Sequence, residues 1–182
     1  NFKNSIDDDT LKKITALIRI SVPYTGLIIS TRENEKMREK LLELGVSQIS
    51  GGSKTSVGGY YKQEKEDSSQ FEVNDNRTLD EVVNWLMKLN YLPSFCTACY
   101  GNNRTGEKFM SLCKEKQIHN FCHPNAIMTL KEYLTDYASN ESKLTGEKLI
   151  QSEISKIKNE TIKQSVLTNI SKISNGERNF KF

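Results

Sequence analysis

Several features that would place a chain of this length in a familiar class are missing from the sequence. No apolar run approaches the roughly 20 residues that a membrane-crossing helix needs, so no membrane span is expected. No apolar signal segment stands at the start, which reads NFKNSIDDD. The 26 basic and 23 acidic residues are mixed along the chain without a basic block, which argues against nucleic acid as the main partner. We therefore expect a soluble protein that binds neither membrane nor nucleic acid.

Length and cysteine content narrow the class further. The 182 residues are too few for a complete eight-stranded α/β barrel, which needs roughly 200 or more. Four cysteines are present, and two of them form the pair Cys96-x-x-Cys99. Such a pair without a signal segment indicates metal or redox chemistry in a reducing compartment rather than a framework of disulfides.

Helix-like and strand-like segments alternate in the first half of the chain. We expect helices at 7–22, 32–45 and 79–90 from their apolar periodicity, and strands at 25–31, 46–50 and 91–100 from their short apolar runs. This alternation predicts an α/β fold with parallel βαβ units, in which functional groups collect at the carboxyl ends of the strands. Arg32 and Cys96 fall there. Three strands would leave open edges, so we expect further strands from residues before Asn1 or from a partner chain.

The remainder is predicted to be helical. A polar loop is expected at 51–75, and beyond Cys99 the expected helices cover 106–116, 130–139 and the apolar stripe of 146–173. Pro124 is expected to interrupt the helical pattern. Thr129 and Glu132 then form a predicted capping box that opens the next helix.

Cys96, Cys99 and Cys122 are the candidate metal ligands. Two thiolates on one tight turn begin many metal and iron–sulfur sites, and Cys122 follows 23 positions later. Structural zinc needs four protein ligands, so a zinc-stabilised, non-enzymatic binding module would recruit His123, His119 or Cys113. A cluster held by three cysteines would instead leave one iron open. The spacing alone leaves both interpretations open, together with merely buried thiols.

A family resemblance runs through these segments. The stretches PSFCTACY, RTGEKFM and FCHPNAIMTLKEYLTDYAS, with IRISVPYTGLIISTRE and LGVSQISGGS before them, closely resemble the carboxyl-terminal part of HydG. The HydG family comprises the radical SAM tyrosine lyases of [FeFe]-hydrogenase maturation. The resemblance extends from Asn1 to GERNFKF, and its most specific element is C-x2-C-x22-C. It implies that 1–95 are the last βα units of a radical SAM TIM-type barrel, incomplete in this chain. Residues 96–182 would be a mostly helical domain that binds an auxiliary cluster.

The resemblance also implies a chemistry. In the complete enzyme, a first [4Fe–4S] cluster bound by C-x3-C-x2-C reduces S-adenosylmethionine, and the radical cleaves tyrosine to p-cresol and dehydroglycine. The latter yields CO and cyanide, which assemble with an additional iron at an auxiliary [4Fe–4S] cluster whose ligands match Cys96, Cys99 and Cys122. This chain has no C-x3-C-x2-C, so it would be a part of the lyase that is not active alone.

The implied partners are the N-terminal remainder of the barrel, tyrosine, other hydrogenase maturation proteins and the [FeFe]-hydrogenase. The implied location is cytoplasmic, in a reducing and anaerobic compartment, or an organellar matrix in a eukaryote.

Three further positions carry expectations. Arg32, in the STRE stretch, is a candidate substrate-binding residue for the carboxylate of tyrosine or S-adenosylmethionine; the alternative is a helix-initial arginine paired with Glu33 or Glu35. Gly101 and Asn103 depart from the family pattern CYRxGRTG, which leaves the shape of that turn open. Arg104 is expected either within reach of the cluster or solvated on a helix surface.

Overall fold

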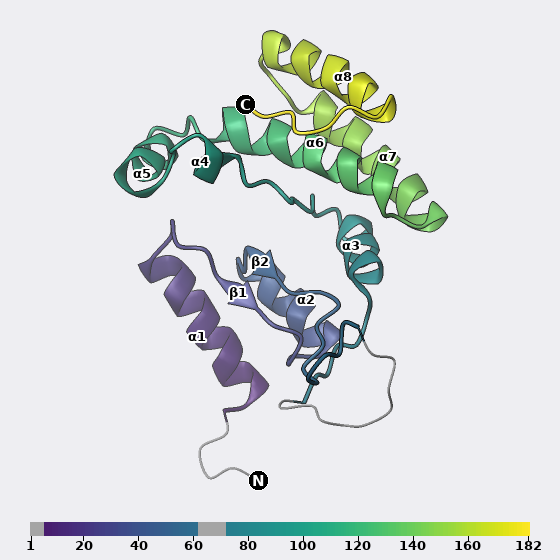
Figure 1. Cartoon of the computed structure of the whole chain (residues 1–182). Helices are drawn as coiled ribbons and strands as arrows, with labels where there is room; N and C mark the ends of the chain where they lie inside the picture. Colours follow the sequence, from purple (N-terminus) through teal and green to yellow (C-terminus); the bar gives the residue numbers. More distant parts are fainter. Residues whose placement is uncertain (1–5, 62–71) are drawn as a thin grey trace. The chain divides into compact units, whose positions relative to one another are not determined.

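The computed structural model describes residues 6–61 and 72–182, in two compact units, Asn1–Leu79 and Asp80–Phe182 (Figure 1). The first unit contains α1 (Asp8–Ser21), β1 (Ile28–Ile29), α2 (Glu35–Glu43) and β2 (Gln48–Ile49). Beyond it follow α3 (Leu79–Lys88), α4 (Ala98–Gly101), α5 (Gly106–Lys114), α6 (His119–Asp136), α7 (Asn140–Ser155) and α8 (Glu160–Ser174). The fold is therefore mostly helical α/β, with a small sheet. No helix in the described part of the chain is long and apolar enough to cross a membrane.

The first unit contains one parallel βαβ connection. Ile28 of β1 is in register with Gln48 of β2, and α2 connects the two strands. The helix begins where Asn34 accepts a hydrogen bond from the Met37 amide at 3.0 Å. The parallel pairing that the sequence predicted is confirmed, although each strand is only 2 residues long. The predicted loop at 51–75 forms turns at 57–61, and its residues 62–71 lie outside the described part.

A buried ion pair ties the loops that follow both strands. Arg38 of α2 is 0% exposed, and it donates to the carboxylate of Asp75 and to the main-chain oxygen of Ser50 after β2. The amide of Asp75 donates to the Thr31 oxygen after β1 at 3.0 Å. Arg77 adds a bidentate contact, with its Nε and Nη2 at 2.9 and 2.6 Å from the two Asp75 oxygens. These contacts therefore tie the carboxyl ends of β1 and β2 together.

The third predicted strand, at 91–100, is wrong. Residues 91–97 have no regular structure, and α4 follows directly. A strand needs a neighbour with which to form a ladder, and the described residues contain only β1 and β2. Pro93 also has no amide hydrogen to donate. Cys96 therefore lies in an irregular segment, not at the end of a strand.

The second unit is built around α6, which packs against both α7 and α8 (Figure 1). Its core contains the side chains of Val83, Met87, Ile127, Leu130, Tyr133, Leu134, Ala138, Leu149, Ile150, Ile154 and Val166. Helices α6 and α7 approach closely at Gly146, where an added Cβ would lie 2.4 Å from Leu134 Cδ1. The predicted helices at 130–139 and 146–173 are confirmed as parts of α6, α7 and α8.

The predicted interruption at Pro124 is also wrong. Helix α6 runs without a break from His119 to Asp136 and contains Pro124 in its second turn. A proline at this position removes one amide donor and crowds the carbonyl four residues earlier, and the buried packing of α6 offsets that cost. Thr129 is therefore inside the helix and not a cap, and its hydroxyl donates to the Ala126 oxygen at 3.3 Å.

Replacing Asp75 should test the buried ion pair. Burial by itself would raise the pKa of Asp75, but hydrogen bonds from Arg77 and the charges of Arg38 and Arg77 lower it to about 2, from 3.8. We expect Asp75→Asn to lower the free energy of unfolding, measured by urea denaturation at pH 7, by about 3 kcal/mol, because the Arg38 cation stays buried without compensation.

The carboxylate of Asp75 stabilises the fold fully above its unfolded pKa and less as the pH falls toward its folded pKa. The stability difference between wild type and Asp75→Asn should therefore narrow between about pH 4 and pH 2. Glu35→Gln is the matched control, since Glu35 contacts Arg77 at 3.1 Å from a half-exposed side chain and should cost less than about 1 kcal/mol. Equal losses in both variants would contradict a central role for Asp75.

Candidate metal centre

The segment that carries Cys96 is fixed on α6 by two residues one helical turn apart. The Phe95 amide donates to the Thr129 hydroxyl at 3.3 Å, and the Phe95 ring stacks on the Tyr133 ring with centroids 4.9 Å apart. Tyr133 is fixed in turn, because its hydroxyl donates to the Asp80 carboxylate at 3.0 Å. Burial, together with this neighbouring carboxylate, raises the pKa of Tyr133, so the hydroxyl remains a donor. Cys96 follows the anchored Phe95 directly.

A compact turn links Cys96 to Arg104. The Ala98 amide donates to Cys96 Sγ at 3.4 Å, and the Arg104 amide donates to the Cys99 oxygen at 2.9 Å, which closes the turn around α4. Asn103 adopts a left-handed conformation with φ of +51°, a conformation that asparagine accepts more readily than most residues other than glycine. The departure at Asn103 is thereby accommodated without loss of the turn.

Cys122 lies at the start of α6, where its amide donates to the Ile118 oxygen at 2.8 Å. Its side chain is exposed, whereas those of Cys96, Cys99 and Cys113 are partly exposed. Although the residue as a whole is exposed, desolvation of its sulfur raises the pKa of the Cys122 thiol, the thiols of Cys99, Cys96 and Cys113 raise it further, and Arg104 opposes these effects. The other three thiols and the Arg104 guanidinium thus lie within electrostatic range of Cys122.

The thiols do not meet as closely as a single ion would require. Within residues 6–61 and 72–182, no three His, Cys, Asp or Glu side chains are grouped so that they could hold one metal ion. Both the zinc and the cluster interpretations of the cysteines therefore stay predictions.

The two histidines near the cysteines have different surroundings. His123 Nε2 lies 2.8 Å from the Glu153 carboxylate, which also receives a hydrogen bond from Lys156. Burial alone would raise the pKa of Glu153, but these two neighbours lower it, so the carboxylate stays charged beside the imidazole. His119 is exposed at the first residue of α6. A carboxylate partner on one ring nitrogen is also common in metal-binding histidines, so the zinc interpretation stays a prediction.

Arg104 is buried, so of its two predicted placements the solvated one on a helix surface is wrong. Its side chain is 8% exposed, its Nη2 donates to the main-chain oxygen of Phe182, and its guanidinium carbon lies 4.5 Å from the centroid of the Phe121 ring. Asn125 holds the same tail residue, since the Phe182 amide donates to its Oδ1 at 2.9 Å. The burial depends on a residue 78 positions away, which no local sequence pattern indicates.

The sequence also gave no expectation for the Arg38–Asp75 pair. A signal was nevertheless present, because Arg38 precedes Leu41 and Leu42 by three and four residues and so shares their buried helical face. A charged residue on such a face needs a buried partner.

Arg32, the other candidate residue, belongs to the first unit. It lies between β1 and α2 with an exposed side chain, and its main-chain oxygen accepts a hydrogen bond from the Asn74 side chain at 2.7 Å. Arg32 is thus held at the carboxyl end of β1, as the sequence predicted.

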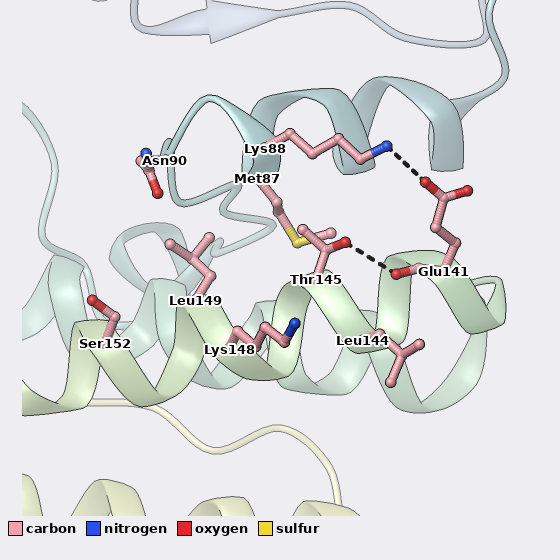
Figure 2. Close-up of a pocket in the computed structure, with 9 residues that line it drawn as sticks. All are labelled: Met87, Lys88, Asn90, Glu141, Leu144, Thr145, Lys148, Leu149 and Ser152. Carbon is pink, nitrogen blue, oxygen red and sulfur yellow. Dashed lines mark hydrogen bonds and ion pairs between the residues drawn. The ribbon is translucent and has the colours of Figure 1, made fainter.

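An open groove of about 380 Å³ lies between the end of α3 and α7 (Figure 2). Lys88 Nζ and Glu141 Oε1, 2.6 Å apart, form an ion pair across it, and Met87 and Leu149 line it with apolar atoms. None of the candidate metal ligands contributes to this groove. It is therefore separate from the cysteine site.

Comparison with known proteins shows the family to which the chain belongs. Residues 1–92 match the family model of the Biotin and Thiamin Synthesis associated domain, and the chain belongs to that family. Over its whole length it is similar to HydG, described as a maturase of the [FeFe]-hydrogenase, whose crystal structure it matches with 48% sequence identity and a TM-score of 0.93. The expected resemblance to HydG is confirmed. The match covers 100% of this chain and 39% of that HydG chain. No curated protein sequence matches significantly.

Substitution of Asn103 should test the turn. Asn103→Ala is expected to lower the free energy of unfolding by about 1 kcal/mol, because alanine tolerates a positive φ less well, whereas Asn103→Gly should be nearly neutral. Asn102→Ala is the matched control, since Asn102 has φ of −101°. Urea denaturation measures all three, and an equal loss at Asn102 would contradict the conformational explanation.

Proposed function

We propose that this chain is the cluster-bearing part of a radical SAM carbon–carbon lyase that cleaves tyrosine and assembles an iron–CO–cyanide unit for [FeFe]-hydrogenase. One observation carries the proposal: a chain 48% identical to HydG over its whole length contains Cys96, Cys99 and Cys122 in the spacing C-x2-C-x22-C. Because the chain spans 39% of the matched HydG chain, the radical chemistry belongs to the complete enzyme.

The residues present fit an auxiliary [4Fe–4S] cluster. Cys96, Cys99 and Cys122 would hold it, since thiolates are the ligands that iron–sulfur clusters take. A buried guanidinium, Arg104, lies within electrostatic range of Cys122 and would offset the negative charge of thiolates and sulfides. When bound, a cluster with three cysteine ligands leaves one iron open to the additional iron, which is the cargo of the reaction.

The first unit would contribute to a radical SAM barrel. The parallel pair β1–β2 with α2 supports its assignment as the last βα units of a TIM-type barrel, with 1–95 in the barrel and 96–182 in the cluster domain. Upstream residues of the complete enzyme would supply the remaining strands, the C-x3-C-x2-C motif and the S-adenosylmethionine site. Its partners would be tyrosine, other maturation proteins and the hydrogenase, in a reducing, anaerobic cytoplasm or organellar matrix.

Arg32 would bind a substrate carboxylate. It lies just beyond β1, at the strand end where barrel enzymes place their functional groups. A guanidinium offers two parallel donors to a carboxylate, so Arg32 would orient tyrosine or S-adenosylmethionine.

Cysteine substitutions test the cluster directly. After anaerobic incubation with iron and sulfide, the chain should show broad visible absorption that bleaches on reduction. Cys96→Ala, Cys99→Ala and Cys122→Ala should each remove most of this absorption and the bound iron, whereas Cys113→Ala, the matched control, should retain both. A colourless wild-type chain that binds one zinc tightly would establish the alternative, a non-enzymatic zinc module.

Assays of the complete enzyme test whether tyrosine cleavage and assembly of the iron–CO–cyanide unit occur at separate sites. Cys96→Ala with Cys99→Ala should leave p-cresol formation near the wild-type rate and abolish formation of the iron–CO–cyanide unit. Chromatography measures p-cresol, and infrared spectroscopy measures the iron-bound diatomics. Loss of p-cresol together with the diatomics would contradict the separation of roles.

Arg32→Gln tests the carboxylate site in the complete enzyme. Loss of a charge-assisted hydrogen bond is expected to raise the KM for tyrosine or for S-adenosylmethionine about tenfold to a hundredfold. The rate of p-cresol formation against each substrate concentration measures this, with Glu33→Gln as the control. An unchanged KM for both substrates, with a loss of stability in Arg32→Gln, would favour a helix-initial ion pair instead.

A further inference from the structure

Arg104 lies between the two ends of the cysteine set. Its amide donates to the Cys99 oxygen at 2.9 Å, and its guanidinium covers the ring of Phe121, the residue before Cys122, at 4.5 Å. Through the oxygen of Phe182, it also holds the tail that Asn125 binds on α6. One residue thus connects the Cys96–Cys99 turn, through its amide, with the start of α6 and the chain tail, through its side chain.

The hydrogen-bonding capacity of Arg104 is not fully used by the protein. Within residues 6–61 and 72–182, its Nε is buried and has no hydrogen-bond partner. A buried donor without an acceptor is costly, and native proteins rarely leave one. The unused Nε–H therefore indicates an acceptor that the chain itself does not supply.

We propose that Arg104 is a positioning residue of the metal centre, which orients the cysteine turn and donates its Nε–H to a sulfur of the bound iron–sulfur cluster. The inference rests on the proposed function, because it needs a cluster at Cys96, Cys99 and Cys122. Hydrogen bonds to the sulfurs and the net charge nearby set the reduction potential of a cluster. Arg104 therefore stabilises the reduced, more negative state and raises the potential.

The test uses Arg104→Met, which removes the charge and the donors, and Arg104→Lys, which keeps the charge but lacks Nε–H. Arg178→Met is the matched control. Arg178 is a partly buried arginine paired with Asp136, fourteen residues along α6 from Cys122 and so roughly 21 Å away along the helix axis. Iron content, circular dichroism and a potential titration followed by electron paramagnetic resonance are measured on each reconstituted chain.

At a fixed potential, Arg104→Met should lower the ratio of reduced to oxidised cluster about tenfold. This change corresponds to a midpoint potential lower by about 59 mV for a one-electron couple. A folded Arg104→Met chain that takes up little iron, while Arg178→Met loads fully, would equally support the positioning role. Arg104→Lys should load iron and show a smaller lowering that is still distinct from wild type. If Arg104→Met does not fold, the Lys variant decides.

Wild-type iron content and midpoint potential in the loaded Arg104 variants would overturn the inference. The proposed function would survive that result, provided that the wild-type chain binds a cluster that the Cys96, Cys99 and Cys122 variants lose. A wild-type chain without a cluster would instead remove the proposed function and this inference together.

Discussion

Packing against α6 is the constraint on which the second unit depends. Leu130 and Leu134 of this helix lie in the core that α7 and α8 complete. Other side chains of the same helix anchor segments that have no ladder or helix of their own: Tyr133 stacks on Phe95, and Asn125 holds the chain tail at Phe182. The positions of the cysteines are therefore a consequence of helix packing.

This arrangement explains how an irregular segment can hold Cys96, a proposed metal ligand, in a fixed position. A loop loses conformational entropy when it is fixed, and a site needs its ligands held rigidly. Hydrogen bonding to Thr129 and aromatic stacking on Tyr133 supply that rigidity for Cys96, while the amide of Arg104 closes the turn at Cys99. Cys122 needs no such device, because it lies within α6 itself.

The sequence predicted those features that local patterns determine. Apolar periodicity identified the helices, and the short apolar runs around Ile28 and Ile49 identified a parallel pair. The third strand failed because a ladder requires a distant partner, and Pro124 failed because packing of α6 outweighs a local helix-breaking preference. For the site, the cysteine spacing could be read directly, but the burial of Arg104 could not, since it depends on the distant tail residue Phe182.

The two buried arginines of the chain solve the same physical problem in different ways. Arg38 is 0% exposed, and the chain itself supplies its counter-charge through Asp75, whose carboxylate is also held by Arg77. This ion pair links the loops that follow β1 and β2. Arg104 has an aromatic ring and a main-chain oxygen as neighbours, and no Asp or Glu side chain in the described residues pairs with it. Its buried Nε has no hydrogen-bond partner among the described residues, so the acceptor that a buried donor normally has would come from the group proposed at Cys96, Cys99 and Cys122.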